Sequence, residues 1–224
     1  MKNIFIIVQA RMTSTRLPKK VMLPLFNNMS VLEIFLKRLN KYKENIIVAT
    51  TNDNSSKSIV QLCKNLNINY YKGSMDNVLE RYYKCAKNFG ANKDDIIVRI
   101  CSDSPCIDPD ILAQVIDFYN NNSFDYVIND TLNGTPKGLN IEVFSFEKLE
   151  YGYLNAVDNF DKEHVTPYIK RNFNVGNFIN DFNNGEYSLT LDTEEDYKYL
   201  KKLFKNLGKI NFNYKELIKG VKEI

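Results

Sequence analysis

The chain has 224 residues, of which 44% are hydrophobic and 12% are aromatic. A chain of this length can bury about 70% of its unfolded surface, so it needs neither disulfides nor a structural metal for stability. Its 30 basic and 27 acidic residues leave a net charge of only +3, which is too balanced to indicate nucleic acid as a partner.

The first predicted element is a strand at Ile4–Val8, a continuous apolar run of the kind that is buried on both faces of a sheet. The run is too short for a membrane span and leads into a polar, basic segment rather than a signal-peptide cleavage site. We therefore expect a cytoplasmic protein that does not bind membranes.

The remainder of the first 130 residues alternates between strand-like and helix-like segments. Capping residues indicate helix starts at Ser30 with Glu33, at Asp76, and at Asp108 with Pro109, while Gly90 marks a helix end. Further strands are predicted at Asn45–Thr50, Asn67–Tyr71, Asp95–Ile100 and Phe124–Ile128. This alternation predicts an α/β fold: a doubly wound, mostly parallel sheet flanked by helices.

The pattern changes after residue 130. Leu139–Phe144 alternates like a strand exposed on one side, and helical spacing follows at Glu147–Val157 and Glu163–Asn172. Tyr187–Leu191 reads as a strand that returns to the main sheet. We therefore predict a nucleotide-binding α/β core over residues 1–130, a small α+β insertion over 131–185, and a return to the core with C-terminal helices over 186–224.

The four cysteines give no sign of a metal or disulfide framework. Cys63 and Cys85 fall within helical patterns, and Cys101 and Cys106 lack the second pair or the clustered histidines of a zinc site.

The segment Gln9–Lys20, QARMTSTRLPKK, follows the first predicted strand and is rich in cations and hydroxyl groups. Parallel sheets bind ligands beyond the carboxyl ends of their strands, and arginine, lysine and hydroxyl donors in such a loop suit a polyphosphate. The glycine patterns of Walker and dinucleotide loops are absent. The alternative is a basic loop that simply faces solvent.

Seven segments together resemble the cytidylyltransferase family that includes the CMP-ulosonate and CMP-sialate synthetases. They are QARMTSTRLPKKVMLPL, VATTNDN (48–54), GSMDNVLERYY (73–83), VRICSDSPCIDP (98–109), GLNIEVF (138–144), EHVTPYI (163–169) and LTLDTEED (189–196). They cover nearly the whole chain in the family's order, and they are most similar to the SpsF-like branch of spore-coat polysaccharide biosynthesis. The resemblance implies a nucleotide-diphospho-sugar transferase-like fold.

The resemblance also implies roles for individual residues. Arg11 and Lys20 would contact the triphosphate and, with Asp103, would be catalytic. The predicted nucleotide-binding residues are Gln9, Ala10, Arg11, Ser14, Arg16, Lys20, Thr50, Gly73 and Asp76. Thr13 and Lys19 stand where the SpsF-like pattern has glycine, so Thr13 must adopt an ordinary backbone conformation, and Lys19 either contacts phosphate or faces water.

Two aspartates follow predicted strands, Asp103 after Asp95–Ile100 and Asp192 after Tyr187–Leu191. An aspartate in such a place is by itself more often a turn or cap residue. Two carboxylates at one sheet edge, facing a basic loop, are what a Mg²⁺-bound triphosphate requires, and the resemblance implies that Asp103 and Asp192 bind Mg²⁺.

The acceptor pocket is expected from the second half of the chain, with Arg99, Asn140 and Glu142 as candidates. Arg99 lies in a buried strand pattern and needs an acidic partner or a ligand. Asn140 replaces an acid found in many relatives. His164 is the only histidine, and a lone helical histidine is more often structural than catalytic.

The predicted activity is transfer of CMP from CTP to a sugar acid or to a sugar or polyol phosphate, with release of pyrophosphate, for surface polysaccharide or glycan synthesis. Two alternatives stay open. One is a metal-dependent GT-A-type glycosyltransferase, in which Ser102-Asp103-Ser104 replaces a DxD motif, and the other is a nucleotide-binding module without catalysis. Since relatives dimerise through the region that 131–185 resembles, a homodimer is also predicted.

Overall fold

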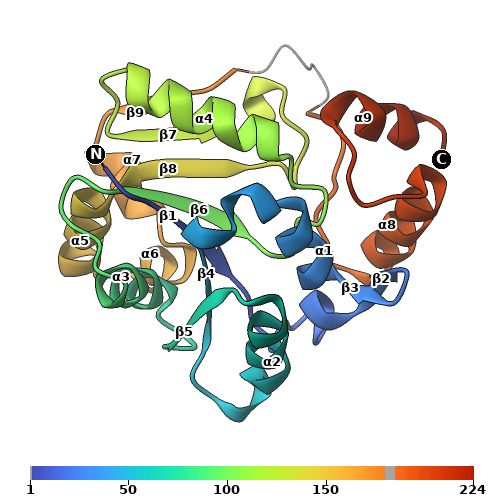
Figure 1. Cartoon of the computed structure of the whole chain (residues 1–224). Helices are drawn as coiled ribbons and strands as arrows, with labels where there is room; N and C mark the ends of the chain where they lie inside the picture. Colours follow the sequence, from blue (N-terminus) through green and yellow to red (C-terminus); the bar gives the residue numbers. More distant parts are fainter. Residues whose placement is uncertain (1, 180–184) are drawn as a thin grey trace.

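A seven-stranded sheet forms the centre of the computed structural model, which describes residues 2–179 and 185–224 (Figure 1). The strand order is β5-β4-β1-β6-β8-β7-β9. The strands are β1 Ile4–Gln9, β4 Ile46–Thr51, β5 Asn69–Gly73, β6 Ile96–Cys101, β7 Tyr126–Asn129, β8 Ile141–Ser145 and β9 Val175–Asn177. Only β8 runs antiparallel to its neighbours, β6 and β7. The prediction of a mostly parallel sheet is therefore confirmed.

Helices cover both faces of this sheet. The α-helices are α1 Val31–Arg38, α2 Lys57–Leu66, α3 Val78–Asn88, α4 Pro109–Asn121, α5 Phe146–Asn155, α6 Asn159–His164, α7 Pro167–Asn172, α8 Glu194–Leu207 and α9 Tyr214–Lys222. The 3-10 helices are η1 Lys20–Met22, η2 Asn40–Asn45, η3 Asn54–Ser56 and η4 Thr131–Asn133, and a small hairpin pairs β2 Pro24–Phe26 with β3 Met29–Ser30.

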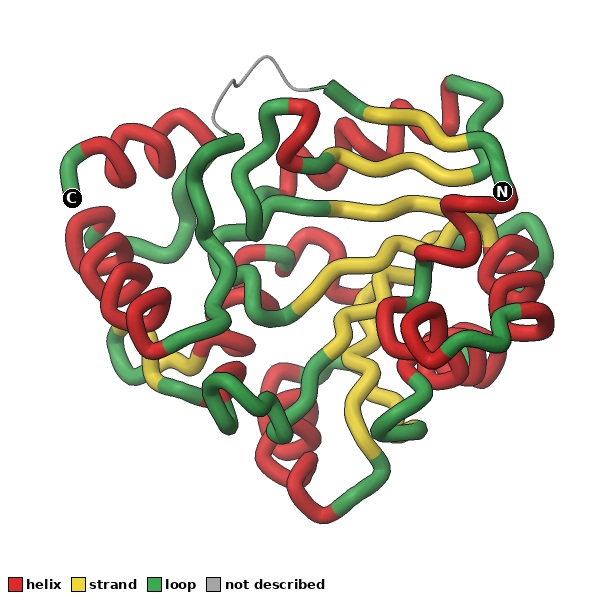
Figure 2. The backbone as a smooth tube through the Cα atoms, turned by 180° about the vertical axis from the view of Figure 1, so that it is seen from behind, coloured by secondary structure: helices red, strands yellow, loops and turns green. Residues whose placement is uncertain are grey.

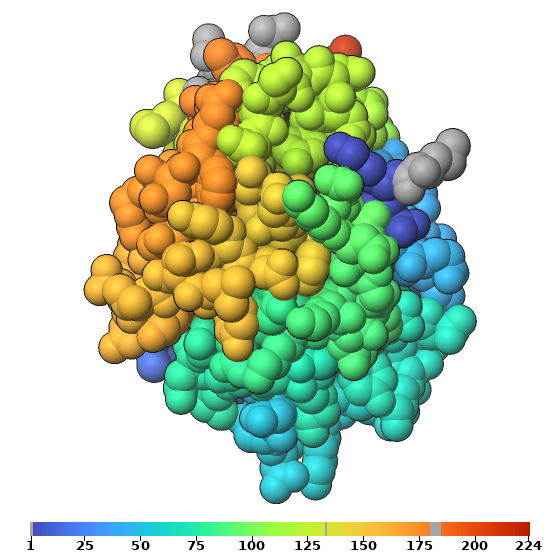
Figure 3. All heavy atoms as spheres, turned by 90° about the vertical axis from the view of Figure 1, so that its left-hand side faces the viewer, coloured from blue at the N-terminus to red at the C-terminus, as the bar shows by residue number. Residues whose placement is uncertain are grey.

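The two faces of the sheet carry separate hydrophobic cores. Along β1, Ile6 and Val8 belong to the core under α1, α2, α4, α8 and α9, whereas Ile7 belongs to the core under α3, α5 and α7. Successive side chains of a strand point to opposite faces, so a strand covered on both faces needs apolar residues throughout. Figure 2 shows these layers from behind, and Figure 3 shows the face where α5 and α6 pack against α3 and α7 packs against α5 and α6.

The helix caps are confirmed in two places and wrong in one. The Ser30 hydroxyl accepts a hydrogen bond from the Glu33 amide, and Asp108 accepts two at the start of α4. Asp76 is not the cap of α3. The side chain of Asn77 accepts the hydrogen bond from the Glu80 amide, at 2.9 Å, and both residue types satisfy a free helix N–H equally well.

Three predicted elements in the second half differ from the structure. β8 is buried on both faces from Ile141 to Phe144, because α4 covers one face and α5 the other. The predicted helix Glu163–Asn172 is interrupted at Val165, between α6 and α7. Tyr187–Leu191 does not join the main sheet, and its one strand-like pairing is an isolated bridge between Ser188 and Lys137. β9, which pairs with β7, was not predicted.

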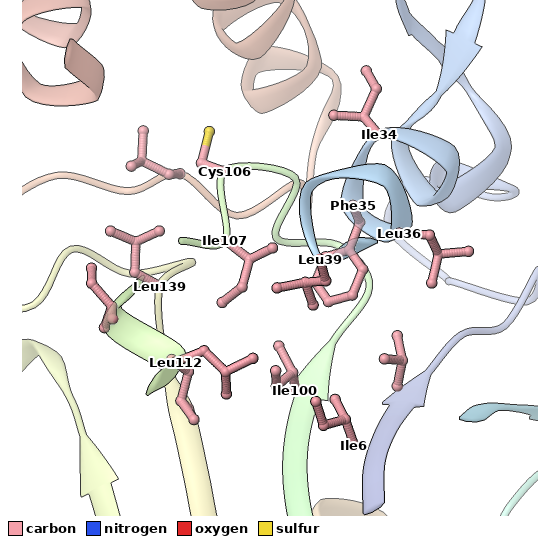
Figure 4. Packing of buried hydrophobic residues seen from close by; sticks show 14 of the residues in the cluster. Ile6, Ile34, Phe35, Leu36, Leu39, Ile100, Cys106, Ile107, Leu112 and Leu139 are labelled. Carbon is pink, nitrogen blue, oxygen red and sulfur yellow. The ribbon is translucent and has the colours of Figure 1, made fainter. Parts of the chain in front are cut away.

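The connection that follows β6 is fixed to the protein interior. Ile107 lies beside Phe35 of α1 and Leu39, the residue that follows the helix, and Cys106 belongs to the same buried core (Figure 4). The buried Arg38 guanidinium donates to the carbonyl of Ile107 at 2.8 Å and lies 3.7 Å from the centre of the Phe212 ring. A buried arginine that donates to backbone carbonyls joins separate segments, so this connection has little freedom to move.

Among residues 2–179 and 185–224, no helix combines the length and the apolarity needed to cross a membrane.

Candidate active site

The loop after β1 begins beside the end of β6. The Gln9 carbonyl accepts hydrogen bonds from the Ser102 amide at 3.2 Å and from the Ser102 hydroxyl at 2.6 Å. The loop is closed by the Lys19 amide, which donates to the Met12 carbonyl at 2.9 Å. Thr13 keeps an ordinary negative φ, as predicted, whereas the exposed Lys19 adopts a left-handed conformation at φ 60°. Glycine fits that conformation without strain.

The ammonium group of Lys20 lies between the two predicted metal ligands. Lys20 Nζ is 2.6 Å from Asp103 Oδ2, 2.9 Å from Asp192 Oδ1 and 2.8 Å from the carbonyl oxygen of Leu191. The structure therefore brings together the basic loop and the two distant aspartates. This convergence is the geometric arrangement that the sequence predicts.

Asp192 is positioned by backbone contacts on both sides. The Leu191 amide donates to the Asp103 carbonyl at 2.8 Å, which ties the two acidic segments together. The Asp192 amide donates to the Asp196 carboxylate at 2.9 Å, and Asp196 completes a capping box with Thr193 at the start of α8. The carboxylate of Asp192 is thus held at a helix N-terminus.

The charges around Asp192 also determine its protonation. Arg16 Nη2 lies 3.0 Å from Asp192 Oδ1, and Lys137 Nζ lies 3.3 Å from Oδ2. Burial raises the pKa of Asp192, but hydrogen bonds and charge from Lys20 and Lys137 outweigh burial, so the pKa is lowered overall. Burial likewise lowers the pKa of Lys20, yet Asp103 and Asp192 raise it overall. At neutral pH both groups are charged.

Two neighbouring cavities open at this edge of the sheet. The loop-side cavity, of about 360 Å³, is bounded by the segment from Gln9 to Val21. The sheet-side cavity, of about 430 Å³, extends over Lys137, Asn140, Glu142 and Thr190. Both cavities are lined by Arg99, Cys101, Asp103, His164 and Asp192. Two ligand groups bound in them would therefore meet beside the aspartates.

A buried ion cluster forms the inner wall of the sheet-side cavity. Glu142 Oε2 is 2.7 Å from Arg99 Nη1, and Glu142 Oε1 is 3.3 Å from Lys170 Nζ. The Thr166 hydroxyl lies 3.2 Å from Oε2. Burial raises the pKa of Glu142, but the charges of Arg99 and Lys170 lower it overall. Arg99 thus has the acidic partner that its place in a buried strand requires.

His164 lies at the junction of the two cavities, next to a strained turn. Val165 has φ 72° and ψ −56°, and the Thr166 amide donates to the His164 carbonyl at 2.9 Å. This is a γ-turn of the rare, strained class, adopted here by a fully buried β-branched residue. Strain of this kind persists where the surrounding structure enforces it. The His164 ring also contacts Phe160, with ring centres 4.5 Å apart.

The structure brings most of the predicted residues to the two cavities. The loop-side cavity is lined by the predicted Gln9, Arg11, Ser14, Arg16, Lys20, Arg99, Asp103 and Asp192. Asp76 lines a third cavity next to Arg11. Asn140 lines the sheet-side cavity, but it is not part of β8, and its amide is held by the Asn129 carbonyl and the Gly138 amide.

Ala10, Thr50 and Gly73 lie outside these cavities as the structure describes them. Ala10 and Thr50 are buried at 1% and 0% exposure. At Gly73 an added Cβ would lie 2.8 Å from the Tyr71 ring and 2.9 Å from Arg81, so close packing by itself accounts for the glycine.

The cavity-lining residues that the sequence did not single out include Cys101, Lys137 and Glu163. Burial raises the pKa of the Cys101 thiol to about 11, so it is neutral at physiological pH and is not a nucleophile. Glu163 and His164 belong to the EHVTPYI segment. The place of this segment in the family's motif order was the signal that could have identified Glu163 as a residue of the site.

A protein-family model with the description cytidylyltransferase matches residues 5–220, which include the basic loop and both aspartates. The chain belongs to the cytidylyltransferase family. This cytidylyltransferase is 37% identical to an uncharacterised protein of Methanocaldococcus jannaschii, over 95% of this chain and 87% of that protein. It is 31% identical to the spore coat polysaccharide biosynthesis protein SpsF of Bacillus subtilis, over 93% of this chain and 89% of that one.

The cytidylyltransferase also resembles a solved structure over its full length. A cytidylyltransferase from Leptospira borgpetersenii superposes with a TM-score of 0.92 at 33% identity, covering 100% of this chain and 95% of that one. The prediction of the family from the sequence motifs is confirmed.

Proposed function

We propose that this cytidylyltransferase transfers CMP from CTP to a sugar acid or to a sugar or polyol phosphate and releases pyrophosphate. The observation that carries the proposal is the convergence of Lys20, Asp103 and Asp192 beside a cavity lined by a basic loop. The B. subtilis relative is named for spore coat polysaccharide biosynthesis, which supports a product used in a surface polysaccharide or glycan.

The loop-side cavity would hold the triphosphate. Arg11, Arg16 and Lys20 line it together. Arginine binds phosphate oxygens through two parallel N–H groups, and lysine contributes a mobile point charge. These side chains would bind the triphosphate and neutralise the charge that develops on the departing pyrophosphate.

The acidic pair fits a magnesium ion. No group of three or more acidic, histidine or cysteine side chains gathers as a metal site within residues 2–179 and 185–224. Mg²⁺, however, is usually held by only one or two carboxylates, together with phosphate oxygens and water, and Asp103 and Asp192 supply those two. When bound, Mg²⁺ would withdraw charge from the phosphate oxygens. We propose it as the cofactor on this basis.

The sheet-side cavity would hold the acceptor. Arg99 and Lys137 line it beside the carboxylates of Asp103, Glu142 and Asp192, and these two cations would bind the anionic group that both acceptor classes carry. The acceptor oxygen would attack the α-phosphorus in line as the bond from that phosphorus to the pyrophosphate oxygen breaks. An attacking hydroxyl passes its proton to solvent, and an attacking phosphate has none to lose. The protein contributes positioning and fixed charge, with no covalent intermediate.

Pyrophosphate release tests the proposal. The protein would be incubated with CTP, Mg²⁺ and a panel of sugar acids and sugar or polyol phosphates, and one class is expected to give turnover. Asp103→Ala should abolish release while the far-ultraviolet circular dichroism spectrum is unchanged. Asp110→Ala is the matched control, because Asp110 lies in the first turn of α4, directly after the same connection, is 74% exposed and pairs with Lys41. Near-normal release by Asp103→Ala, or CTP binding without turnover on any acceptor, contradicts the proposal.

A further inference from the structure

The Lys20 ammonium has the oxygen environment of a small bound cation. Its three hydrogen bonds go to one oxygen each of Asp103, Asp192 and Leu191, at 2.6 to 2.9 Å. An ammonium group has three N–H donors, so these contacts use its full capacity. The side chain is 12% exposed. A phosphate would therefore find this lysine already engaged.

We propose that Lys20 is an exchangeable counter-ion of the Asp103–Asp192 pair. In the ligand-free protein it holds the space between the two carboxylates, and it moves to the phosphates when a divalent cation arrives together with the triphosphate. This inference rests on the proposed function, because it concerns the same two ligands. Its consequence is that metal and nucleotide bind cooperatively, and that the ligand-free protein binds a free divalent cation weakly.

The charges of the site support this exchange. Five cations, Arg11, Arg16, Lys20, Arg99 and Lys137, and four carboxylates, Asp103, Glu142, Glu163 and Asp192, line the two cavities, which leaves an excess of one positive charge on these side chains. A triphosphate carries roughly four negative charges at neutral pH, because its terminal phosphate ionises twice. A divalent cation alone would raise this excess to about three positive charges, and the triphosphate alone would leave about three negative charges. Bound together they leave only about one negative charge, so each ligand reduces the charge imbalance that the other creates.

A divalent cation that binds without the triphosphate has no phosphate charge to compensate its own. It would displace the Lys20 ammonium from the carboxylates and leave two like charges close together at a partly buried site, where repulsion is strong. A bound triphosphate removes the penalty, since its oxygens accept the displaced N–H groups. The four-carbon lysine stem is flexible enough for the movement, whereas Asp103 and Asp192 are held by the hydrogen bond from the Leu191 amide to the Asp103 carbonyl.

Manganese binding without nucleotide tests the inference directly. Free Mn²⁺ would be followed by electron paramagnetic resonance during titration of the wild type, of Lys20→Met and of Arg16→Met. Methionine keeps an unbranched chain but removes every donor, so Lys20→Met should bind Mn²⁺ at least tenfold more tightly than the wild type. Arg16→Met loses the same charge beside Asp192 but keeps Lys20 between the carboxylates. It should change Mn²⁺ affinity less than threefold.

A second measurement addresses folding. Lys20→Met leaves two carboxylates facing each other without a counter-ion, so its thermal midpoint should be lower than that of the wild type. Mn²⁺ should raise the midpoint of Lys20→Met by more than it raises the midpoint of the wild type. Equal Mn²⁺ affinity and equal thermal shifts in Lys20→Met and the wild type overturn the exchange. If the wild type then still releases pyrophosphate, the proposed function stands. Conversely, a gain of Mn²⁺ binding in Lys20→Met supports the exchange even where the wild type shows no turnover with any acceptor.

Discussion

Replacing Glu142 by glutamine removes one charge from the most deeply buried ion cluster of the site without changing the size of the side chain. Glu142 is 7% exposed and contacts Arg99 at 2.7 Å and Lys170 at 3.3 Å. The change leaves the buried Arg99 guanidinium without its acidic partner.

The expected cost follows from this burial. Removing one partner of a buried ion pair typically destabilises a protein by about 3–5 kcal/mol. Lys170 is 38% exposed and can turn toward water, so the lower end, about 3 kcal/mol, is expected here. For a chain of this size that corresponds to a fall of about 6–12 °C in Tm.

Urea unfolding at pH 7 followed by circular dichroism measures this loss. Glu147→Gln is the matched control, because Glu147 is 43% exposed and pairs at 3.0 Å with Lys93, which is 71% exposed. An exposed pair contributes about 0–1 kcal/mol. Adding Arg99→Met to Glu142→Gln should recover part of the stability, because the unpaired charge is then absent.

The pH dependence gives an independent check. The folded-state pKa of Glu142 is lowered from its ordinary 4.5, so its contribution is present above about pH 4.5 and disappears as pH falls through the lower folded-state pKa. The stability difference between wild type and Glu142→Gln should therefore shrink below pH 4.5. A difference under 1 kcal/mol at pH 7, or one independent of pH, refutes the assignment of Glu142 as the required counter-charge of Arg99.

Three further substitutions, with Gly90→Ala as a control, test the segments around the site. Lys19→Gly should raise stability by about 0.5–1 kcal/mol in urea unfolding, because glycine relieves the left-handed φ of 60°; lower stability contradicts this. Gly138→Ala should destabilise by at least about 2 kcal/mol and reduce pyrophosphate release, since its Cβ would lie 2.7 Å from the Leu189 backbone, next to Asp192. Gly90→Ala has positive φ but open space, so it should cost only about 1 kcal/mol, and equal losses in the two alanine variants refute the clash. Arg38→Met should lower the urea midpoint and reduce pyrophosphate release, because Arg38 fixes the connection after β6; unchanged values contradict that role.

The first half of the fold could be predicted because its signals are local. The buried run of β1 and the cap at Asp108 each specify an element without knowledge of distant residues. Once the strands are parallel, their carboxyl ends share one edge. The position of Asp103 near the basic loop follows from that rule alone.

Predictions failed where a distant neighbour decides the outcome. β8 alternates in sequence like a half-exposed strand, but α4 and α5 cover both of its faces, and Glu142 is buried only because Arg99 and Lys170 are there to pair with it. The only local signal near the break at Val165 is Pro167, which occupies the first turn of α7, a position that proline favours. Asp and Asn are equally good N-cap residues. The conformation of the backbone before α3 therefore determined that Asn77, and not Asp76, caps the helix.

The sequence by itself determined the family, the parallel core and the residues that meet at its edge, because hydrophobic periodicity and short motifs act over a few neighbouring residues. Only the tertiary structure decided that Lys20 lies between Asp103 and Asp192 and that His164 lies where the two cavities join. Such positions depend on how segments far apart in the chain share one buried space, where each charge must find an opposite charge or a ligand.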